Sequence, residues 1–131
     1  ITTVIEAHAS IASTGLVALD FYDGCQLYDL EHREKWLIDL DQNRDGPFVV
    51  DADRLPGATS YMAPEELTRG ATVDERTTVF NLGRMVHHLL PLDGAWLGTA
   101  AQRDLAVTAT AADPDHRHQT VAALLEQWVQ A

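Results

Sequence analysis

Aspartates are the residues of this sequence whose type and spacing could do chemistry. Asp20 and Asp39 stand 19 residues apart, and Asp39 opens the triplet Asp39-Leu40-Asp41. Carboxylate oxygens suit a hard cation such as Mg²⁺, and a positioned carboxylate can also take a proton from a reacting hydroxyl. Two further Asp-x-Asp triplets, at 51–53 and 113–115, are what an acidic composition produces by chance. The triplet alone is therefore uninformative, and only its spacing to other motifs can give it meaning.

Histidine and cysteine predict no metal site of their own. The histidines at 87–88 and at 116 and 118 occur without a positioned cysteine pair or a His-Glu-x-x-His helix, so we expect them to be packed or solvated. The single cysteine, Cys25, excludes an internal disulfide framework and a cysteine-based zinc site. One free thiol fits a reducing compartment, and we expect a cytoplasmic protein.

Composition limits the class of partner. The net charge is −11 and only nine residues are Lys or Arg, scattered along the chain, which argues against nucleic acid or an anionic membrane surface as the main partner. No apolar run is long enough to span a bilayer. With 131 residues, 46% of them hydrophobic, and neither repeat nor linker, the sequence predicts one continuous unit over 1–131.

The periodicity of apolar residues predicts helices on either side of a small hairpin. We expect helices over 1–13, 75–90, 99–111 and 121–129, and strands over 26–30 and 35–40 joined by a charged turn at 31–34. The polar stretch 41–56 predicts a long surface loop. The expected fold is mostly α with a small β-hairpin. The helix over 75–90 is apolar around much of its circumference and should lie at the centre.

The stretch from Gly57 to Leu67 combines turn residues with the start of a helix. Pro64 suits a first helical turn, where its missing N–H costs nothing, and Glu65 and Glu66 follow where the helix dipole favours carboxylates. A helix should therefore begin near Pro64. Ala63-Pro64-Glu65 also resembles the Ala-Pro-Glu motif that closes the activation segment of protein kinases.

Other kinase motifs are matched in order along the chain. The segment 18–25 resembles the catalytic loop, 38–41 the Asp-Phe-Gly step, 78–83 part of the central helix of the C-terminal lobe, and 112–117 the loop whose arginine pairs with the Ala-Pro-Glu glutamate. The resemblance implies a protein-kinase-like C-terminal lobe. Its parts would be a helix at 1–14, a catalytic loop and metal-site hairpin at 15–41, an activation segment at 42–66 and a helical core at 75–130.

The resemblance also implies a role for each site residue. Asp20 would orient an acceptor hydroxyl and take its proton, while Asp39 would coordinate Mg²⁺ that bridges the phosphates of ATP. Asp41 could add a second oxygen ligand, and Cys25 occupies the cofactor-binding place of the family's metal-binding asparagine. Structural roles fall to Glu65 and Arg117, which would form a buried bidentate pair.

Departures from the family's motifs leave three functional classes open. The acceptor could be a protein Ser/Thr hydroxyl, and Val73-Asp74-Glu75-Arg76 is similar to stretches of bacterial protein kinases. Leu40-Asp41 in place of Phe-Gly is closer to small-molecule kinases related to aminoglycoside phosphotransferases. Changes at Ala18, Leu19, Cys25, Ala58 and Thr78 would suit a pseudokinase, a catalytically dead binding module.

The N-terminal lobe of a kinase has no counterpart in this sequence. No Gly-x-Gly-x-x-Gly loop or Val-Ala-Ile-Lys strand is present, and these form the roof and the phosphate-anchoring lysine of the ATP site. We therefore expect the chain to bind ATP poorly by itself and to work with an N-terminal lobe as its partner.

Overall fold

The helix expected over 75–90 lies at the centre of the molecule. It is α2 (Glu75–Leu89) in the computed structural model, which describes residues 1–131. The Asp74 carboxylate caps its start by accepting a hydrogen bond of 2.9 Å from the Arg76 N–H. Nearly every turn of α2 contributes fully buried side chains, among them Val79, Leu82 and Met85. The helix is therefore enclosed by the rest of the chain, as its apolar circumference requires.

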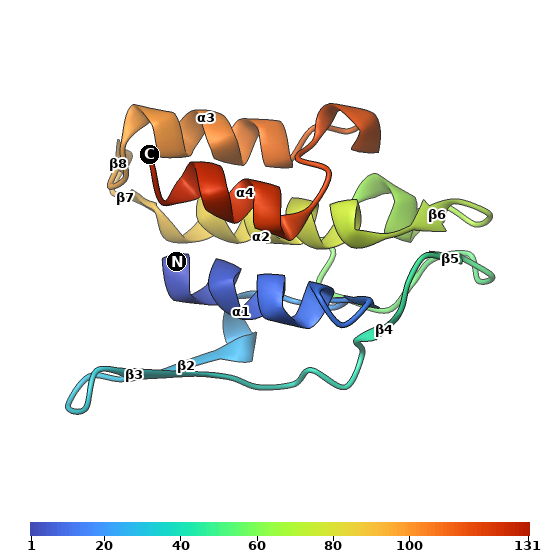
Figure 1. Cartoon of the computed structure of the whole chain (residues 1–131), viewed down its shortest axis with the longest axis horizontal. Helices are drawn as coiled ribbons and strands as arrows, with labels where there is room; N and C mark the ends of the chain where they lie inside the picture. The colour runs from blue at the N-terminus through green and yellow to red at the C-terminus, as the bar shows by residue number, and fades with distance from the viewer.

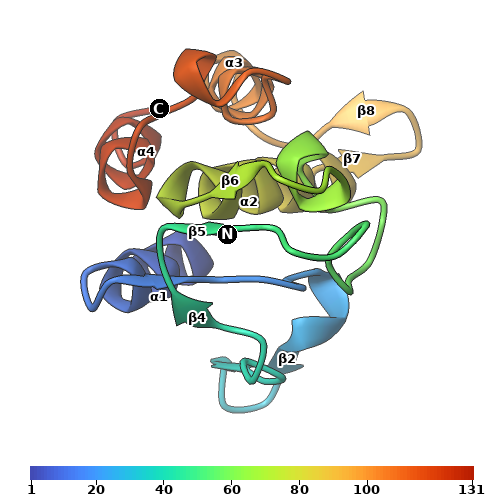
Figure 2. The ribbon, with the colours of Figure 1, turned by 90° about the vertical axis from the view of Figure 1, so that its right-hand side faces the viewer.

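Three further helices surround α2. They are α1 (Thr2–Ala12), α3 (Ala100–Ala109) and α4 (Val121–Trp128). Figures 1 and 2 show α3 above α2 and α1 below it, with α4 between α3 and α1. Gly83 permits α3 to approach closely, because a methyl group in its place would lie 2.8 Å from the Ala109 Cβ. The first and last helices pack together, and the Trp128 Nε1–H donates a 3.1 Å hydrogen bond to the Thr2 Oγ1. None of the helices has both the length and the apolar character to cross a lipid bilayer.

Four pairs of short antiparallel strands and three single turns of 3-10 helix complete the α+β fold. The pairs are β1 (Leu16–Val17) with β4 (Arg44–Asp45), β2 (Gln26–Asp29) with β3 (Glu34–Leu37), β5 (Phe48–Val49) with β6 (Thr72–Val73), and β7 (Pro91–Leu92) with β8 (Ala95–Trp96). The 3-10 turns are η1 (Asp23–Cys25), η2 (Pro64–Leu67) and η3 (Pro114–His116).

The hairpin of β2 and β3 projects from the body of the molecule (Figure 1). Asp29 organises its turn, since its Oδ1 accepts hydrogen bonds from the N–H groups of Glu31 and His32. Leu27 lies opposite Trp36 in the register, and both are about half exposed. An isolated two-stranded hairpin is marginally stable in water. Leu27 and Trp36 therefore leave apolar surface of the hairpin exposed.

Two apolar clusters hold the loops against the helices. The larger is built from all four helices and takes in Phe21, Cys25 and Tyr61. The smaller lies under the loops and consists of Val17, Leu19, Val50, Leu55, Met62 and Val73. Residues 17–25 and 61–62 contribute to both clusters, so these two segments are fixed in the same part of the fold.

The observed elements differ from expectation in two places. The helix expected at Pro64 is only η2, because Thr68 adopts an extended backbone with a 3.2 Å bond from its N–H to the Glu65 carbonyl. The stretch 41–56, expected to be loop throughout, contains β4 and β5. Each of these strands has two residues, too few for a periodic signal, and each depends on a partner strand elsewhere in the chain.

Candidate active site

The loop that carries Asp20 is held by its backbone. It follows β1, and the buried Thr78 on α2 binds its first residue. The Ala18 N–H donates to the Thr78 Oγ1 at 3.0 Å, and the hydroxyl lies 3.4 Å from the Ala18 carbonyl oxygen. Phe21 packs its ring against the buried His8 of α1, with centroids 4.3 Å apart. Contacts on both sides of Asp20 therefore fix the loop to two helices.

Asp20 itself adopts a conformation that few aspartates take. Its φ is 51°, in the left-handed region, and its side chain is partly exposed. The Asp20 Oδ1 accepts a 3.1 Å hydrogen bond from the Ala58 N–H. Gly57 has a φ of 151°, and a side chain on it would lie 3.2 Å from the Met62 sulfur and 3.4 Å from the Asp20 Oδ1. Glycine at 57 thus lets the chain pass directly over the carboxylate.

Asp39 shares with Asp20 a left-handed backbone conformation. It has a positive φ of 61° and is exposed at the base of the hairpin. The pKa of the Tyr22 phenol is raised. The largest cause is the charge that Cys25 carries at the high pH where a phenol titrates; burial and the carboxylates of Asp39, Asp20 and Asp23 follow in that order. The charges of Asp20, Asp23 and Asp39 thus all act on the phenol of Tyr22.

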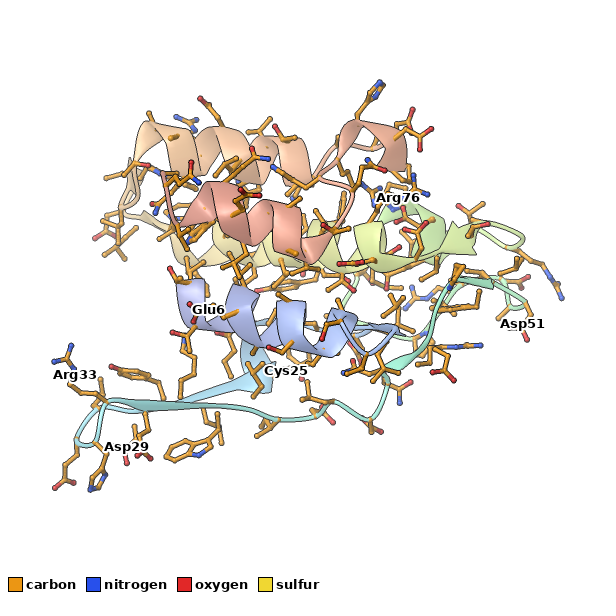
Figure 3. All side chains as sticks on the ribbon, in the orientation of Figure 1. Glu6, Cys25, Asp29, Arg33, Asp51 and Arg76 are labelled. Atoms are coloured by element: carbon orange, nitrogen blue, oxygen red, sulfur yellow. The ribbon has the colours of Figure 1, made fainter.

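Cys25 is a poor ligand for Mg²⁺ in this setting. The side chain is 1% exposed, and its thiol lies 3.6 Å from the Asp20 carbonyl oxygen as a donor. Burial raises the pKa of the Cys25 thiol, and the charges of Asp39, Asp20 and Asp23 raise it further. A neutral, soft sulfur does not match a cation that prefers hard oxygen ligands. Figure 3 shows Cys25 beneath α1, far from the hairpin tip at Asp29 and Arg33.

Asp39 and Asp41 do not form a closed metal site. Both side chains are exposed, and the Asp41 Oδ2 accepts a 3.3 Å hydrogen bond from the side chain of Gln42. No three His, Cys, Asp or Glu side chains converge as they would around a metal ion. An exposed carboxylate such as Asp39 nevertheless fits Mg²⁺ that arrives with a nucleotide, because this ion commonly takes one or two protein carboxylates and completes its shell with phosphates and water.

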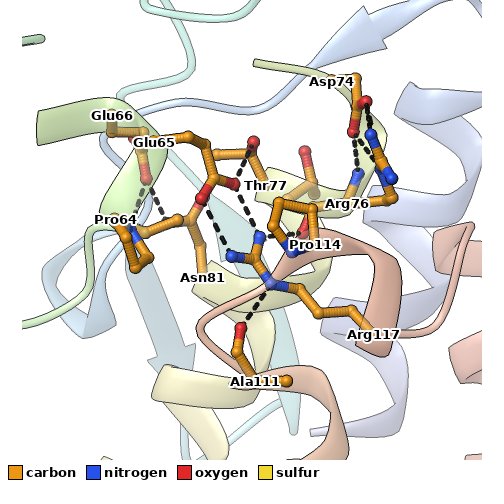
Figure 4. A network of polar contacts seen from close by, with 12 residues as sticks. Pro64, Glu65, Glu66, Asp74, Arg76, Thr77, Asn81, Ala111, Pro114 and Arg117 are labelled. Atoms are coloured by element: carbon orange, nitrogen blue, oxygen red, sulfur yellow. Dashed lines mark hydrogen bonds and ion pairs between the residues drawn. The ribbon is translucent and has the colours of Figure 1, made fainter. Parts of the chain in front are cut away.

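Glu65 and Arg117 are brought together across 52 residues. The Arg117 Nη1 donates to the Glu65 Oε1 at 2.6 Å and the Nη2 donates to the Oε2 at 2.9 Å, so the pair is bidentate (Figure 4). Both side chains are buried. The Thr77 hydroxyl donates a further 2.8 Å hydrogen bond to the Glu65 Oε1. This carboxylate thus joins η2 to α2 and to the loop after α3.

Every N–H group of the Arg117 guanidinium has an acceptor. Beyond Glu65, it donates to the carbonyl oxygens of Ala111, Ala112 and Arg76 at 2.7 to 3.1 Å. Its carbon lies 4.8 Å from the centre of the Phe80 ring. A fully satisfied guanidinium of this kind is a structural anchor, and lysine could not reproduce its planar fork.

Sequence reasoning missed two polar residues that complete this region. Glu66 and Asn81 are both buried, and the Asn81 Nδ2 donates to the Glu66 Oε2 at 3.0 Å. Burial raises the pKa of Glu66 to about 7. The available signal was the spacing of Asn81 on α2, where a polar residue interrupts the apolar stretch 79–82.

Thr78 offers a direct test of how the Asp20 loop is held. Thr78→Val keeps the side-chain shape and removes the hydroxyl, which leaves the buried Ala18 N–H without an acceptor. We expect a loss of about 1–3 kcal/mol in the free energy of unfolding, measured in urea. Thr108→Val is the matched control, because the Thr108 hydroxyl binds only the Asp104 carbonyl on the exposed face of α3. Equal losses in the two variants would contradict a bracing role for Thr78.

Comparison with known proteins gives no family for this chain. No protein-family model matches the sequence, and no curated protein matches it either.

Proposed function

We propose that this chain is the C-terminal lobe of a protein-kinase-like phosphotransferase that transfers a phosphoryl group from Mg-ATP to a hydroxyl, with protein Ser/Thr as the preferred acceptor. The observation that supports this best is the arrangement of the segment 57–67. One end binds the Asp20 carboxylate through the Ala58 N–H, and the other is tied to the helical core through Glu65 and Arg117. A segment anchored in this way can fix a catalytic carboxylate relative to an acceptor.

Asp20 is the proposed proton acceptor. The Ala58 N–H occupies its Oδ1, which leaves the Oδ2 to accept a hydrogen bond from an incoming hydroxyl and then its proton. The left-handed backbone of Asp20 and the two helix contacts of its loop limit how far the carboxylate can move. Asp39 would hold Mg²⁺, and the bound ion would neutralise negative charge on the phosphates. Two residues after Asp20 in the chain, the Tyr22 ring stands edge to face with that of Tyr61, with centroids 6.3 Å apart.

An N-terminal lobe is the partner that this proposal requires. The exposed Leu27, Trp36 and Ile38 lie on the hairpin that carries Asp39, where a second lobe would complete the nucleotide site. The negative charge of the region 20–41 also requires such a lobe. The four aspartates at 20, 23, 39 and 41 repel phosphate, so a cation from another segment is needed before ATP can bind. The cytoplasm, which supplies ATP and Mg²⁺, is the compartment that the proposal implies.

A pseudokinase is the second candidate. The observation that favours it is the buried, neutral thiol of Cys25 at a position where a metal-binding oxygen would serve catalysis. A small-molecule kinase is the third, and it rests on Leu40-Asp41 alone. The Glu65 and Arg117 pair, which such enzymes do not usually carry, favours the protein-kinase side.

The test is Mg²⁺-dependent ATP turnover by the full-length polypeptide that carries this sequence. We expect Asp20→Asn to reduce turnover by about 10²- to 10⁴-fold, the range for loss of a general base. Asp39→Asn should abolish the turnover that Mg²⁺ supports, whereas Asp104→Asn, on the exposed side of α3, should leave turnover unchanged.

The outcomes separate the three candidates. Transfer to Ser/Thr peptides favours the protein kinase, and transfer to hydroxyls of small molecules alone favours the third candidate. Nucleotide binding without turnover would point to the pseudokinase. Turnover that survives both substitutions would overturn the roles given to Asp20 and Asp39.

A further inference from the structure

Glu66 is a fully buried carboxyl group with no cation beside it. Its exposed fraction is 0%, and its Oε2 accepts two hydrogen bonds, from the Ala63 N–H at 2.7 Å and from the Asn81 Nδ2 at 3.0 Å. Its Oε1 is equally buried and has no hydrogen-bond partner in the chain. A buried carboxylate with a vacant oxygen is costly, so the protonated form is favoured.

Asn81 leaves a second buried acceptor unpaired. Its Nδ2 donates to the Tyr61 carbonyl at 2.9 Å as well as to Glu66, and this fixes the orientation of the amide. The reverse orientation would turn the amide oxygen towards two acceptors. The Asn81 Oδ1 is therefore also buried without a partner. A proton on Glu66 adds a donor to a group of side chains that otherwise has an excess of acceptors.

Charges on the surrounding elements also disfavour ionisation of Glu66. The negative charges of Glu65 and of Asp20 both act on it in this direction. Cations on the packed elements are already engaged, since Arg117 binds Glu65 and Arg84 on α2 donates to the Ser60 carbonyl at 2.8 Å. His88 of α2 stacks on the Tyr61 ring, with centroids 4.5 Å apart. The Leu55 N–H donates to the Glu66 carbonyl from a neighbouring loop. The charged residues Asp53 and Arg54 of this loop are exposed to solvent.

Glu66 connects α2 to the segment that reaches Asp20. Ser60, Tyr61 and Ala63 are bound to α2 directly or through Glu66, and Ala58, five residues before Ala63, donates to the Asp20 carboxylate. Loosening the contacts of Glu66 would free the middle of this segment. The link from Glu66 to Asp20 thus runs through a single short stretch of backbone.

We propose that Glu66 is a proton-dependent anchor: its neutral carboxyl holds residues 58–63 on α2, and its ionisation releases them together with their hold on Asp20. This inference goes beyond the proposed phosphotransferase and does not depend on it, because the contacts that carry it are internal to the chain.

The direction of the pH effect follows from the raised pKa. Burial, the largest cause, raises the pKa of Glu66 from 4.5 to about 7 in the folded chain. The closed segment is therefore most stable below pH 4.5, the ordinary pKa. It loses stability as the pH rises from 4.5 to about 7, the raised pKa. With these two pKa values, the equilibrium constant for opening of residues 58–63 should rise about tenfold between about pH 6 and about pH 8.

Amide hydrogen exchange of this chain, followed by NMR and corrected for intrinsic rates, tests the proposal. The reporters are the N–H groups of Ala63 and Ala58. We expect the tenfold rise in opening at both amides in the wild type and no such rise in Glu66→Gln, which keeps the shape and cannot ionise. Glu6→Gln is the control, because Glu6 is exposed on α1 (Figure 3) and should behave as the wild type.

A second measurement keeps the test decisive if Glu66→Gln fails to fold. The ¹³C shift of the Glu66 carboxyl in the wild type, followed with pH, reports its protonation directly. A midpoint near 7 supports the proposal. An ordinary midpoint, as for a carboxylate served by water, overturns it, and so does a Glu66→Gln variant whose opening rises with pH as in the wild type.

Discussion

Arg117→Ala should destabilise this fold by roughly 3–5 kcal/mol, the cost of stranding one member of a buried ion pair. Glu65 is only 7% exposed and would lose both of its bonds to the guanidinium. The carbonyl oxygens of Ala111, Ala112 and Arg76 would lose their donor in the same step. We expect a lower urea midpoint with an unchanged slope, since the extent of the folded region is the same.

Two companion variants isolate the cause of that loss. Arg69→Ala removes an arginine whose 3.4 Å contact with Asp53 lies in solvent, and it should cost at most about 1 kcal/mol. Arg117→Lys keeps the charge and loses the fork, so its stability should fall between that of Arg117→Ala and the wild type. A loss for Arg117→Ala no larger than that for Arg69→Ala would contradict a structural role for the pair.

Trp128→Ala is the second change with a large expected effect. Trp128 is 4% exposed, belongs to the main core cluster and donates to Thr2 on α1. Truncation of a buried tryptophan removes its packing and leaves a cavity, at a cost of about 3–5 kcal/mol. Loss of thermal stability in calorimetry is the measurement.

Controls for Trp128 separate its volume from its hydrogen bond. Trp128→Phe retains most of the buried ring and removes the indole N–H, so it should cost clearly less than the alanine variant. Trp36→Ala removes a half-exposed indole from the hairpin and should have little effect. A Trp36 variant as unstable as the Trp128 variant would show that the hairpin, rather than the contact of α1 with α4, limits stability.

The sequence allowed the helices and the main hairpin to be predicted because each has a periodic apolar pattern. The bounds of α2 agree with the expected 75–90 to one residue, and Thr99 and Thr120 cap α3 and α4. Glu65 and Arg117 were expected to meet, and they do. That expectation came from motif spacing, because no local pattern joins residues 52 positions apart.

The remaining features depend on tertiary contacts that leave no local signal. The sequence marked Thr78 only as a departure from the kinase motif, and its hydrogen bond becomes visible only when β1 delivers the Ala18 N–H to it, 60 residues away. Glu66 was interpreted only as a first-turn helix carboxylate favoured by the helix dipole. In the structure, the short η2 turns it inward against Asn81 instead.

The packing of α1 on α4 matters during synthesis of the chain. The ribosome releases α1 long before α4, so the buried face of Val4, Ile5 and His8 lacks the larger part of its cover until α4 emerges, with Trp128 reaching back over 126 positions to Thr2. At ordinary elongation rates this interval is on the order of ten seconds. A nascent chain in that interval presents an incompletely covered apolar helix, so this region should be the one that chaperones bind and that prematurely terminated chains expose to proteolysis.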